Sequence, residues 1–368
     1  MFDRKTFVEI NINNYLHNLQ LIKDRNKSNI IPVLKADGYG HGAIQLSKAA
    51  YDFGVDLIAV AFLGEGIEIK KNGVNIETLV FNYVTPKYIK ENIENFIYTI
   101  GSLDQLEELI NYFGKDIKNI KLHININTGM NRMGLNIKDL DKMIKIIKDY
   151  NLNIHGIYSH FATADNLDDF VKEQYELYIN AVNYIENANI NIPIKHISNS
   201  AASLFFPEYS LDYVRPGIAT YGLQPSDIKI EKNLKPVLTW KSIVARIGIL
   251  KKNESVSYGR TFFADKDIPI ATIPVGYADG YFRQLSNKGY VLIQGEICNI
   301  IGRVCMDQFV VETTKIPEIK LGEEVVLIGK QKEKQLYAEN LAKLAGTINY
   351  DITSKITKRV PRVYIEEA

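Results

Sequence analysis

The chain has 368 residues, of which 46% are hydrophobic and 24% charged, and its formal net charge is +1. One hydrophobic core usually stops growing below this length, so we expect two domains. The near-neutral charge and high apolar content exclude a disordered chain and argue against a nucleic-acid partner.

The first residues, 1–5, lack the long apolar stretch of a signal peptide. No later segment approaches the roughly 20 apolar residues of a membrane span. The only cysteines are Cys298 and Cys305, too few for a disulfide framework. We therefore expect a cytoplasmic protein without a membrane partner.

Residues 12 to about 225 alternate short apolar runs with amphipathic stretches, the pattern of βα units and a parallel sheet. Strands are predicted at 29–35, 55–61, 78–83, 96–100, 120–126, 154–160, 194–198 and 211–215. Helices between them include 42–53, 103–113, 137–149 and 167–187. Eight such repeats in about 210 residues predict a (β/α)8 barrel of the TIM type. We assign this barrel to residues 1–232.

The sequence changes character after Gln224 and Pro225. Short runs rich in β-branched and aromatic residues follow at 242–249, 268–275, 290–293, 299–304, 308–311 and 324–328. They predict a C-terminal, mainly antiparallel β domain over residues 233–368, interrupted by one helix at 338–344. The N-terminal run 6–10 also resembles a strand and could pair with this domain, so residues 1–10 are left open between the two.

Lys35 ends an apolar segment, 30–34, and three glycines follow within seven residues. A hydrated ammonium at the tip of a buried strand is usually paired with an opposite charge or has a role in binding or catalysis. A lysine amine also forms Schiff bases with carbonyl cofactors. A strand-end lysine that reaches solvent is the alternative.

Other polar residues also follow predicted strands, and in a barrel these strand ends face the active-site mouth. They are Arg132, His160, Asn199, Ser200, Arg215 and Gly217. The loops after strands 7 and 8 often bind phosphate through backbone N–H groups and a helix N-terminus. A Schiff-base lysine, a phosphate cradle and a strand-end arginine together suggest pyridoxal 5'-phosphate, which has an aldehyde, a phosphate and a ring nitrogen.

The run VLKADGYGHG (33–42) resembles the cofactor-attachment signature of the alanine racemases, pyridoxal-phosphate-dependent barrel enzymes. Further stretches resemble the same family in the same order: NTGMNRMG (127–134), SHFA (159–162), SNSA (198–201), RPG (215–217), SYGR (257–260), PVGYADG (274–280), GRVCMD (302–307) and RVPR (359–362). The resemblance covers nearly the whole chain, including both predicted domains.

The resemblance implies two catalytic residues. Lys35 would hold the cofactor as a Schiff base and then act as the base on one face of the substrate, while Tyr258 of a second subunit would act on the opposite face. Racemisation needs both, because a proton removed and returned on one side restores the starting material. His160 is the expected partner of Tyr258. Before the motif is considered, a packed strand tyrosine with its hydroxyl satisfied is the default interpretation of Tyr258, because the chain has 22 tyrosines.

The resemblance also implies the remaining site residues. Arg215 would donate to the pyridine nitrogen, leaving it unprotonated, although an ordinary strand-end ion pair would also explain this arginine. The other implied cofactor-binding residues are Tyr39, His160, Asn199, Ser200, Gly217, Ile218 and Tyr350. Arg132 and the backbone of Met306 would bind the substrate carboxylate. Tyr277 would narrow the entrance, with Asp165, Arg283 and Arg303 further out.

The chain departs from the family pattern at Asn125, where many members carry a carbamylated lysine, and at Asn127, where an aspartate is usual. An amide cannot form a carbamate, so Arg132 would lack an anionic partner. We expect a small anion such as chloride near Asn125 and Arg132. No metal site is expected, because the histidines lack ligand spacing.

The predicted function is therefore two-base racemisation of L- and D-alanine by a pyridoxal-phosphate-dependent homodimer with shared active sites, supplying D-alanine for peptidoglycan. A racemase of broader specificity, acting on serine or other amino acids, is the alternative. A non-catalytic cofactor carrier with a similar barrel would lack a β domain, so residues 233–368 argue against it. A decarboxylase of the same architecture would place a carboxylate against the pyridine nitrogen, so Arg215 argues against that class.

Overall fold

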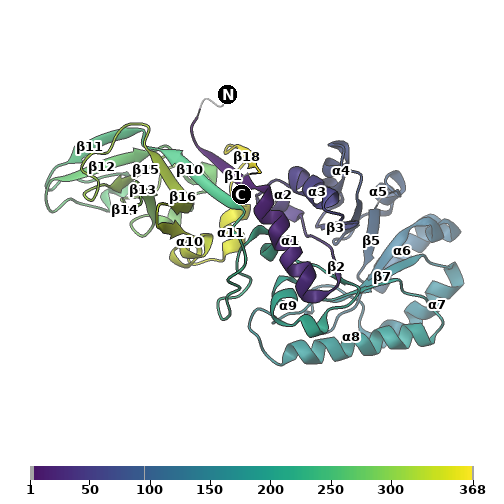
Figure 1. Ribbon diagram of the computed structural model, residues 1–368. Coiled ribbons are helices and arrows are strands. Elements are labelled where there is room, and N and C mark those ends of the chain that lie inside the picture. The colour runs from purple at the N-terminus through teal and green to yellow at the C-terminus, as the bar shows by residue number, and fades with distance from the viewer. Residues whose placement is uncertain (1–3, 95, 367–368) are drawn as a thin grey trace.

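The computed structural model describes residues 4–94 and 96–366. Two units lie side by side, a barrel wrapped by helices and a mainly antiparallel sheet (Figure 1). The predicted fold class is thus confirmed. The ends of the predicted domains, residues 1–3 and 367–368, lie outside the described residues.

The barrel has eight parallel strands in the order β2-β9-β8-β7-β6-β5-β4-β3. Their bounds are β2 Asn29–Ile30, β3 Leu57–Val60, β4 Glu77–Val80, β5 Phe96–Ile100, β6 Lys121–Asn125, β7 Ile154–Tyr158, β8 Ile194–His196 and β9 Tyr213–Val214. Each falls within, or within one residue of, a predicted run. The carboxyl ends of all eight strands therefore open on one side, where a barrel carries its active site.

The first predicted strand, 29–35, is wrong in extent because β2 stops at Ile30. Pro32 lacks the N–H that a strand interior needs. Closure is nevertheless achieved past the proline: Val33 forms a parallel bridge with Ala59, and the Leu34 N–H donates to the Ala59 carbonyl at 2.8 Å. Lys35 consequently lies just beyond the barrel wall rather than at the end of a strand.

Helices cover the outside of the barrel (Figure 1). They are α1 Ile12–Asn26, α3 Ala43–Asp52, α4 Leu63–Lys71, α5 Pro86–Glu91, α6 Leu103–Phe113, α7 Leu140–Tyr150, α8 Phe170–Asn187 and α9 Ser200–Phe205. The short segment α2 Lys35–Tyr39 lines the cavities instead. The predicted helix 137–149 is split into a 3₁₀ turn, η2 Ile137–Asp139, and α7. The other 3₁₀ turns are η1 Gly114–Asn119, η3 Pro207–Tyr209, η4 Ile218–Tyr221, η5 Tyr258–Arg260, η6 Tyr277–Asp279 and η7 Arg283–Leu285.

The second sheet follows the path β11-β12-β15-β14-β13-β16-β10-β1-β18, with β17 paired to β16. Its strands are β1 Phe7–Asn11, β10 Leu238–Ile243, β11 Arg246–Leu250, β12 Ile268–Ile273, β13 Tyr290–Ile293, β14 Glu296–Ile301, β15 Phe309–Glu312, β16 Glu324–Gln331, β17 Lys334–Leu336 and β18 Arg362–Ile365. Two helices accompany it, α10 Ala338–Ala345 and α11 Asn349–Ser354. The predicted strand 242–249 is wrong, because it is broken between β10 and β11.

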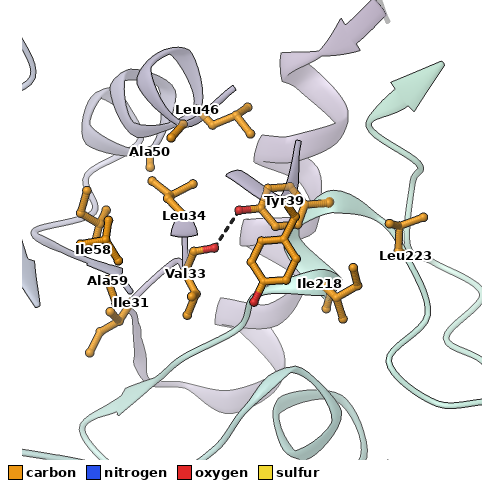
Figure 2. Packing of buried hydrophobic residues seen from close by; sticks show 14 of the residues in the cluster. Ile31, Val33, Leu34, Tyr39, Leu46, Ala50, Ile58, Ala59, Ile218 and Leu223 are labelled. Carbon is orange, nitrogen blue, oxygen red and sulfur yellow. Dashed lines mark hydrogen bonds between the residues drawn. The ribbon is translucent and has the colours of Figure 1, made fainter. Parts of the chain in front are cut away.

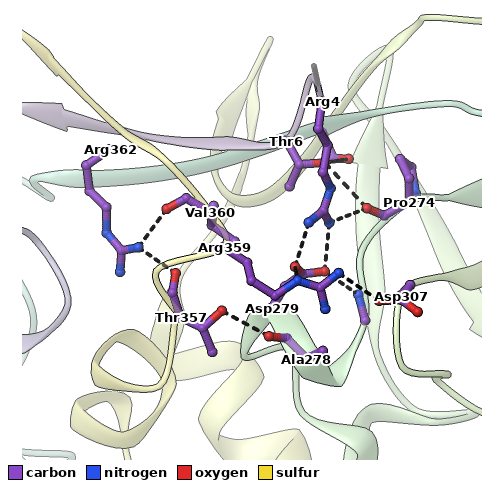
Figure 3. A network of polar contacts seen from close by, with 12 residues as sticks. Arg4, Thr6, Pro274, Ala278, Asp279, Asp307, Thr357, Arg359, Val360 and Arg362 are labelled. Carbon is purple, nitrogen blue, oxygen red and sulfur yellow. Dashed lines mark hydrogen bonds and ion pairs between the residues drawn. The ribbon is translucent and has the colours of Figure 1, made fainter. Parts of the chain in front are cut away.

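Both ends of the chain enter this second sheet. The strand β1 pairs antiparallel with β10 and parallel with β18. Arg4 binds both carboxylate oxygens of the buried Asp279 at 2.6 and 2.7 Å, and Arg359 binds Asp307 at 2.8 Å (Figure 3). The Arg4 pair ties the N-terminal segment to the turn that carries Tyr277.

The segment that leads to Lys35 is packed on every side. Val33 and Leu34 lie among buried residues of α3 and β3, and the Tyr221 hydroxyl donates to the Val33 carbonyl at 2.7 Å (Figure 2). Leu34 is fully buried. Close packing of this kind fixes where the backbone of Lys35 starts.

Among the described residues, no helix is both long and apolar enough to cross a membrane.

Candidate active site

Lys35 opens a left-handed turn of the backbone. Ala36, Asp37 and Tyr39 have φ of +52°, +53° and +54°, and Gly38 has +60°. This conformation costs a residue with a side chain roughly 1–2 kcal/mol, and such strain persists only where surrounding structure holds it. Side chains from other elements supply that support.

Two charged side chains hold the turn from either side. Glu65, in the first turn of α4, accepts the Ala36 N–H at 2.6 Å. From the far end of the chain, Arg362 donates to the Gly40 carbonyl at 2.9 and 3.0 Å. Inside the turn, Asp37 accepts the Ala43 N–H at 2.9 Å. These bonds hold the backbone of the turn, and the Lys35 side chain lines both cavities of the barrel.

Burial lowers the pKa of Lys35, and the nearby positive charge of Arg132 lowers it further. A lower pKa leaves more of the amine unprotonated near neutral pH, the form that attacks a carbonyl carbon. Its ammonium lies 5.9 Å from the centre of the Tyr39 ring. Lys35 thus has the properties that a covalent attachment site needs.

A polar cradle lies next to Lys35. The Ser200 hydroxyl accepts the backbone N–H groups of Gly217 at 2.8 Å and Ala219 at 3.3 Å. The Tyr39 hydroxyl lies so close to Gly217 that a β-carbon there would approach it within 2.5 Å. The Tyr350 ring lies 5.9 Å from that of Tyr39. Hydroxyl and amide donors that converge in this way suit a phosphate.

Two further predicted cofactor residues frame this cradle. Asn199 caps α9 by accepting the Ala202 N–H at 3.0 Å, and its amide donates to the Phe161 carbonyl at 3.3 Å. Ile218 is fully buried behind the cradle. Asn199 therefore fixes where α9 starts, and only the backbone of Ile218 is available to a ligand.

Arg215 lies in the barrel interior, buried and surrounded by acceptors. Its Nη2 donates to the Ser159 carbonyl at 2.7 Å and meets His160 Nδ1 at 3.2 Å, and its Nη1 meets His196 Nδ1 at 2.7 Å. The guanidinium also lies over the Tyr158 ring, 5.0 Å from its centre. Burial lowers the pKa of Arg215 to about 10, so it keeps its charge at neutral pH.

Two cavities share Lys35, Arg132 and His160 among their lining residues. The larger, of about 970 Å³, is lined by Lys35, Tyr39, Arg132, His160, Asn199, Ser200, Gly217, Ile218 and Tyr350, among others. The smaller, of about 300 Å³, is lined by Lys35, Asn125, Arg132, His160 and Arg215, among others. Three cationic side chains face the smaller cavity, and no carboxylate is among its lining residues. It is therefore suited to anionic groups.

The loop after β6 presents Arg132 to both cavities. Asn127 organises this loop: its side-chain oxygen accepts the N–H groups of Gly129 at 3.1 Å and Asn131 at 3.0 Å. Asn125 is 8% exposed and lines the smaller cavity beside Arg132. Asn125 contributes only an amide to that surface, so it adds no negative charge.

Tyr258, Tyr277 and Met306 lie elsewhere, on the β domain. They are 72%, 42% and 52% exposed, and none of them lines either cavity that Lys35 faces. Tyr258 and Met306 share a shallow hollow of about 500 Å³. The Tyr277 N–H donates to the Cys305 carbonyl, next to Met306. Within one chain, the three form a separate patch.

The outer predicted residues are divided in the same way. Asp165 lines the larger cavity, whereas Arg283 and Arg303 do not. Arg303 lies against Gly259, beside Tyr258. No group of histidine, cysteine and acidic side chains within residues 4–94 and 96–366 could hold a metal ion.

Sequence reasoning missed three residues that contact Arg215 or the Lys35 turn: Tyr158, His196 and Glu65. Tyr158 and His196 end neighbouring strands of the barrel, and a search for inward-facing polar residues on each strand could have found them. Glu65 also accepts the Phe62 N–H, in the position of a helix-capping acid.

A barrel whose mouth holds a depressed-pKa lysine, a phosphate-type cradle and a buried arginine defines a cofactor-dependent barrel enzyme of the Schiff-base type. Comparison with known proteins narrows the class. Residues 10–225 match the model of the alanine racemase N-terminal domain, and residues 237–364 match that of the C-terminal domain. The chain belongs to the alanine racemase family.

Individual relatives agree. An alanine racemase of Clostridium novyi is 40% identical over 377 residues, covering 99% of this chain and 96% of the relative. Among solved structures, an alanine racemase of Clostridium difficile is 35% identical with a TM-score of 0.91, covering 99% and 97%. That of Bacillus anthracis, with bound L-Ala-P, is 33% identical with a TM-score of 0.92, covering 99% and 96%.

Proposed function

We propose that this protein interconverts L- and D-alanine with pyridoxal 5'-phosphate as its cofactor. One observation carries the proposal: a lysine with a lowered pKa shares a cavity with a hydroxyl-and-amide cradle and with cations at the carboxyl ends of the barrel strands. Relatives named alanine racemase favour alanine over serine or other amino acids as substrate.

The donor set fits the cofactor. The Lys35 amine suits its aldehyde, and the hydroxyls of Tyr39, Ser200 and Tyr350 suit its phosphate, together with the backbone N–H of Ile218 and the close approach that the backbone at Gly217 allows. The missing β-carbon of Gly217 leaves room for that approach. When bound, the cofactor supplies an electron sink that acidifies the hydrogen on the amino-acid α-carbon.

Lys35 then acts as the base on one face of the α-carbon, and Tyr258 of a second copy acts on the other face. The exposed patch around Tyr258 supports this division, because a single chain keeps it out of the Lys35 cavities. Tyr277 would narrow the entrance, and the backbone of Met306 would meet the substrate carboxylate. We infer a homodimer with two shared sites.

His160 is arranged to assist Tyr258. Arg215 can only donate, so His160 Nδ1 accepts from it and the ring proton lies on Nε2. Burial lowers the pKa of His160 to about 3, which keeps the ring neutral and this tautomer in place. Its Nε2–H is then free to donate to the phenolate of Tyr258, which stabilises the basic form.

Arg215 selects racemisation over decarboxylation. A guanidinium offers five N–H donors and no acceptor, so the ring nitrogen that it meets stays unprotonated. An unprotonated ring nitrogen would draw electrons less strongly, so Arg215 would favour return of the proton to the α-carbon. A decarboxylase of this architecture would need a carboxylate at that place, and none lines the smaller cavity.

Arg132 is suited to the substrate carboxylate, because its planar fork matches two oxygens. Asn125 leaves this arginine without an anionic neighbour in the smaller cavity. We propose that chloride occupies the space near Asn125 and Arg132. Exchange of chloride for gluconate should raise the KM for alanine, and an anomalous signal from bromide should appear beside Arg132; absence of both contradicts the proposal.

The experiment that tests the function combines three measurements on the purified protein. We expect a yellow bound cofactor, D-alanine formed from L-alanine without release of carbon dioxide, and borohydride labelling at Lys35. Labelling of another lysine would overturn the attachment site. Carbon dioxide release, or serine turned over faster than alanine, would overturn the reaction or the substrate.

The wider setting follows from the reaction. D-alanine is a building block of peptidoglycan, so we propose a biosynthetic role in the cytoplasm. The free cysteines, Cys298 and Cys305, suit its reducing conditions. We place the boundary between the cofactor-binding barrel and the β domain at residues 232 and 233.

A further inference from the structure

A line of histidines crosses the barrel interior beneath Arg215. His196 Nε2 lies 3.1 Å from His123 Nδ1, and His123 Nε2 lies 3.1 Å from His155 Nδ1. At its upper end His196 meets Arg215, which follows β9 at the mouth. At its lower end His155 is the second residue of β7, near the amino ends of the strands. We call His155, His123 and His196 the histidine column.

The hydrogen bonds in the column have one possible direction. Arg215 can only donate, so His196 Nδ1 accepts and the proton of that neutral ring lies on Nε2. This N–H requires an acceptor at His123 Nδ1, which places the His123 proton on Nε2. The same step makes His155 Nδ1 an acceptor.

The inner members of the column have no accessible charged form. His123 and His196 are fully buried, and burial lowers the pKa of both well below the ordinary value. The ring of Tyr158 stacks on His196 with its centre 5.0 Å away, so the ring has little room to turn. These two histidines stay neutral and can change only the nitrogen that carries the proton.

The lower end, in contrast, meets solvent and charge. The His155 side chain is 22% exposed, and its Nε2 lies 3.8 Å from Glu77 of β4. Lys121 of β6 pairs with the same carboxylate, and Asp56, before β3, is the other charge that acts on this ring. Burial lowers the pKa of His155, Glu77 and Asp56 raise it, and Lys121 lowers it, with a net shift below the ordinary value.

We propose that the histidine column positions Arg215 for the reaction, and that a proton taken up by His155 at the far end of the barrel breaks this support. The inference rests on the proposed function only for its effect on racemisation.

The geometry gives the cause. A proton from solvent can add only at His155 Nδ1, where it faces the N–H of His123 across 3.1 Å. His123 can relieve that clash by moving its proton to Nδ1, and His196 can repeat the step. The last step places an N–H against Arg215 Nη1 at 2.7 Å, where no acceptor remains. One contact in the line must therefore open, and in this proposal it is the contact between His196 and Arg215.

Nitrogen-15 labelling of histidine in the cofactor-loaded protein tests the column directly. The chain has only 6 histidines, so each ring can be assigned by single substitutions. We expect His123 and His196 to carry Nε2–H at neutral pH, and their signals to shift in acid with the midpoint of His155. Nδ1–H on either ring at neutral pH, or signals that ignore the titration of His155, would overturn the proposal.

Two substitutions of His155 separate its role as a hydrogen-bond acceptor from its ability to take up a proton. His155→Asn keeps an acceptor oxygen near Nδ1 but cannot titrate, so the His196 signal should lose its acid transition. His155→Phe removes the acceptor, so the His123 Nε2–H, which Arg215 and His196 still hold in place, loses its hydrogen bond and its nitrogen-15 signal should shift already at neutral pH. Identical spectra for the two variants would refute the column. Glu77→Gln should move the wild-type midpoint to lower pH, because it removes a charge that favours protonation.

The pH profile of kcat/KM gives the second readout. One pH unit below the His155 midpoint, about nine-tenths of the columns carry the extra proton, so the wild type should fall about tenfold below His155→Asn. If kcat/KM falls equally in acid for the wild type and for His155→Asn, the proposed effect of the column on the reaction is refuted. An inactive protein with the expected histidine spectra refutes the racemase function alone, because the spectra do not depend on turnover.

Discussion

A mixture of two inactive variants should recover about a quarter of the wild-type racemase activity if each site draws on two copies of the chain. The perturbations are Lys35→Ala, which removes the proposed attachment amine, and Tyr258→Phe, which removes the proposed base on the opposite face. Both side chains are accessible, Lys35 from the cavity and Tyr258 with 72% exposure, so neither change threatens the fold.

The expected recovery of activity follows from the separation of the Lys35 cavities and the Tyr258 patch within one chain. In a mixed dimer one site combines both substitutions, and the other combines the intact Lys35 of one copy with the intact Tyr258 of its partner. Random re-association makes about half of all dimers mixed, and each has one working site of two, which gives about 25% of wild-type activity. A site built from one chain would give nothing.

The assay unfolds and refolds the two variants together and follows D-alanine formation against each variant refolded alone. Lys35→Ala mixed with Arg132→Ala is the matched control, because both residues line the cavities of the same barrel. This control pair should stay inactive in every combination. Recovery in the control, or none in the test mixture, would refute the shared site.

Three further predictions concern stability and cofactor binding. Asp279→Asn should destabilise the protein by about 3–5 kcal/mol in urea unfolding, because it leaves Arg4 without its buried partner; a loss under 1 kcal/mol would contradict this. Burial lowers the pKa of His41 to about 4, so the unfolded chain binds more protons below pH 6.5 and stability falls as the pH drops to 4, by about 3 kcal/mol from this group. His41→Asn should therefore flatten the dependence of unfolding on pH, and an unchanged slope would count against it. Gly217→Ala should weaken pyridoxal phosphate binding at least about tenfold in a titration, because its β-carbon would approach the Tyr39 hydroxyl within 2.5 Å; unchanged affinity would argue against the cradle.

The barrel strands were predictable because each is a short apolar run between amphipathic helices, and burial on both faces leaves that pattern in any parallel sheet. The error at 29–35 has a local cause. Pro32 ends the ladder of β2, yet Val33 and Leu34 still close the barrel through Ala59. The end of β2 at Ile30 and the separate bridge at Val33 could not be told apart from apolar character alone, because both segments are buried.

The left-handed turn after Lys35 could not be predicted in the same way. Ala36 and Tyr39 have no local preference for positive φ, and an aspartate such as Asp37 adopts it only occasionally. Their conformation depends on Glu65 and Arg362, which lie 29 and 322 residues away from the backbone atoms that they hold. The residue types of the turn indicated its chemistry, while its shape is a property of the assembled fold.

Tyr258 marks a different limit. Nothing in its surroundings along the chain distinguishes it from the other tyrosines of the protein, and only the resemblance of residues 257–260 to a family motif singled it out. The fold adds a physical reason for its exposure. A barrel mouth approaches a bound molecule from one side, so a group on the opposite face must come from outside that barrel. The sheet that presents Tyr258 and Met306 is held by both chain ends through β1 and β18, and by Arg4 on Asp279 beside Tyr277. On the proposed function, the same chain builds a cavity that lacks one base and an exposed patch that carries it, so two copies would complete each other's sites.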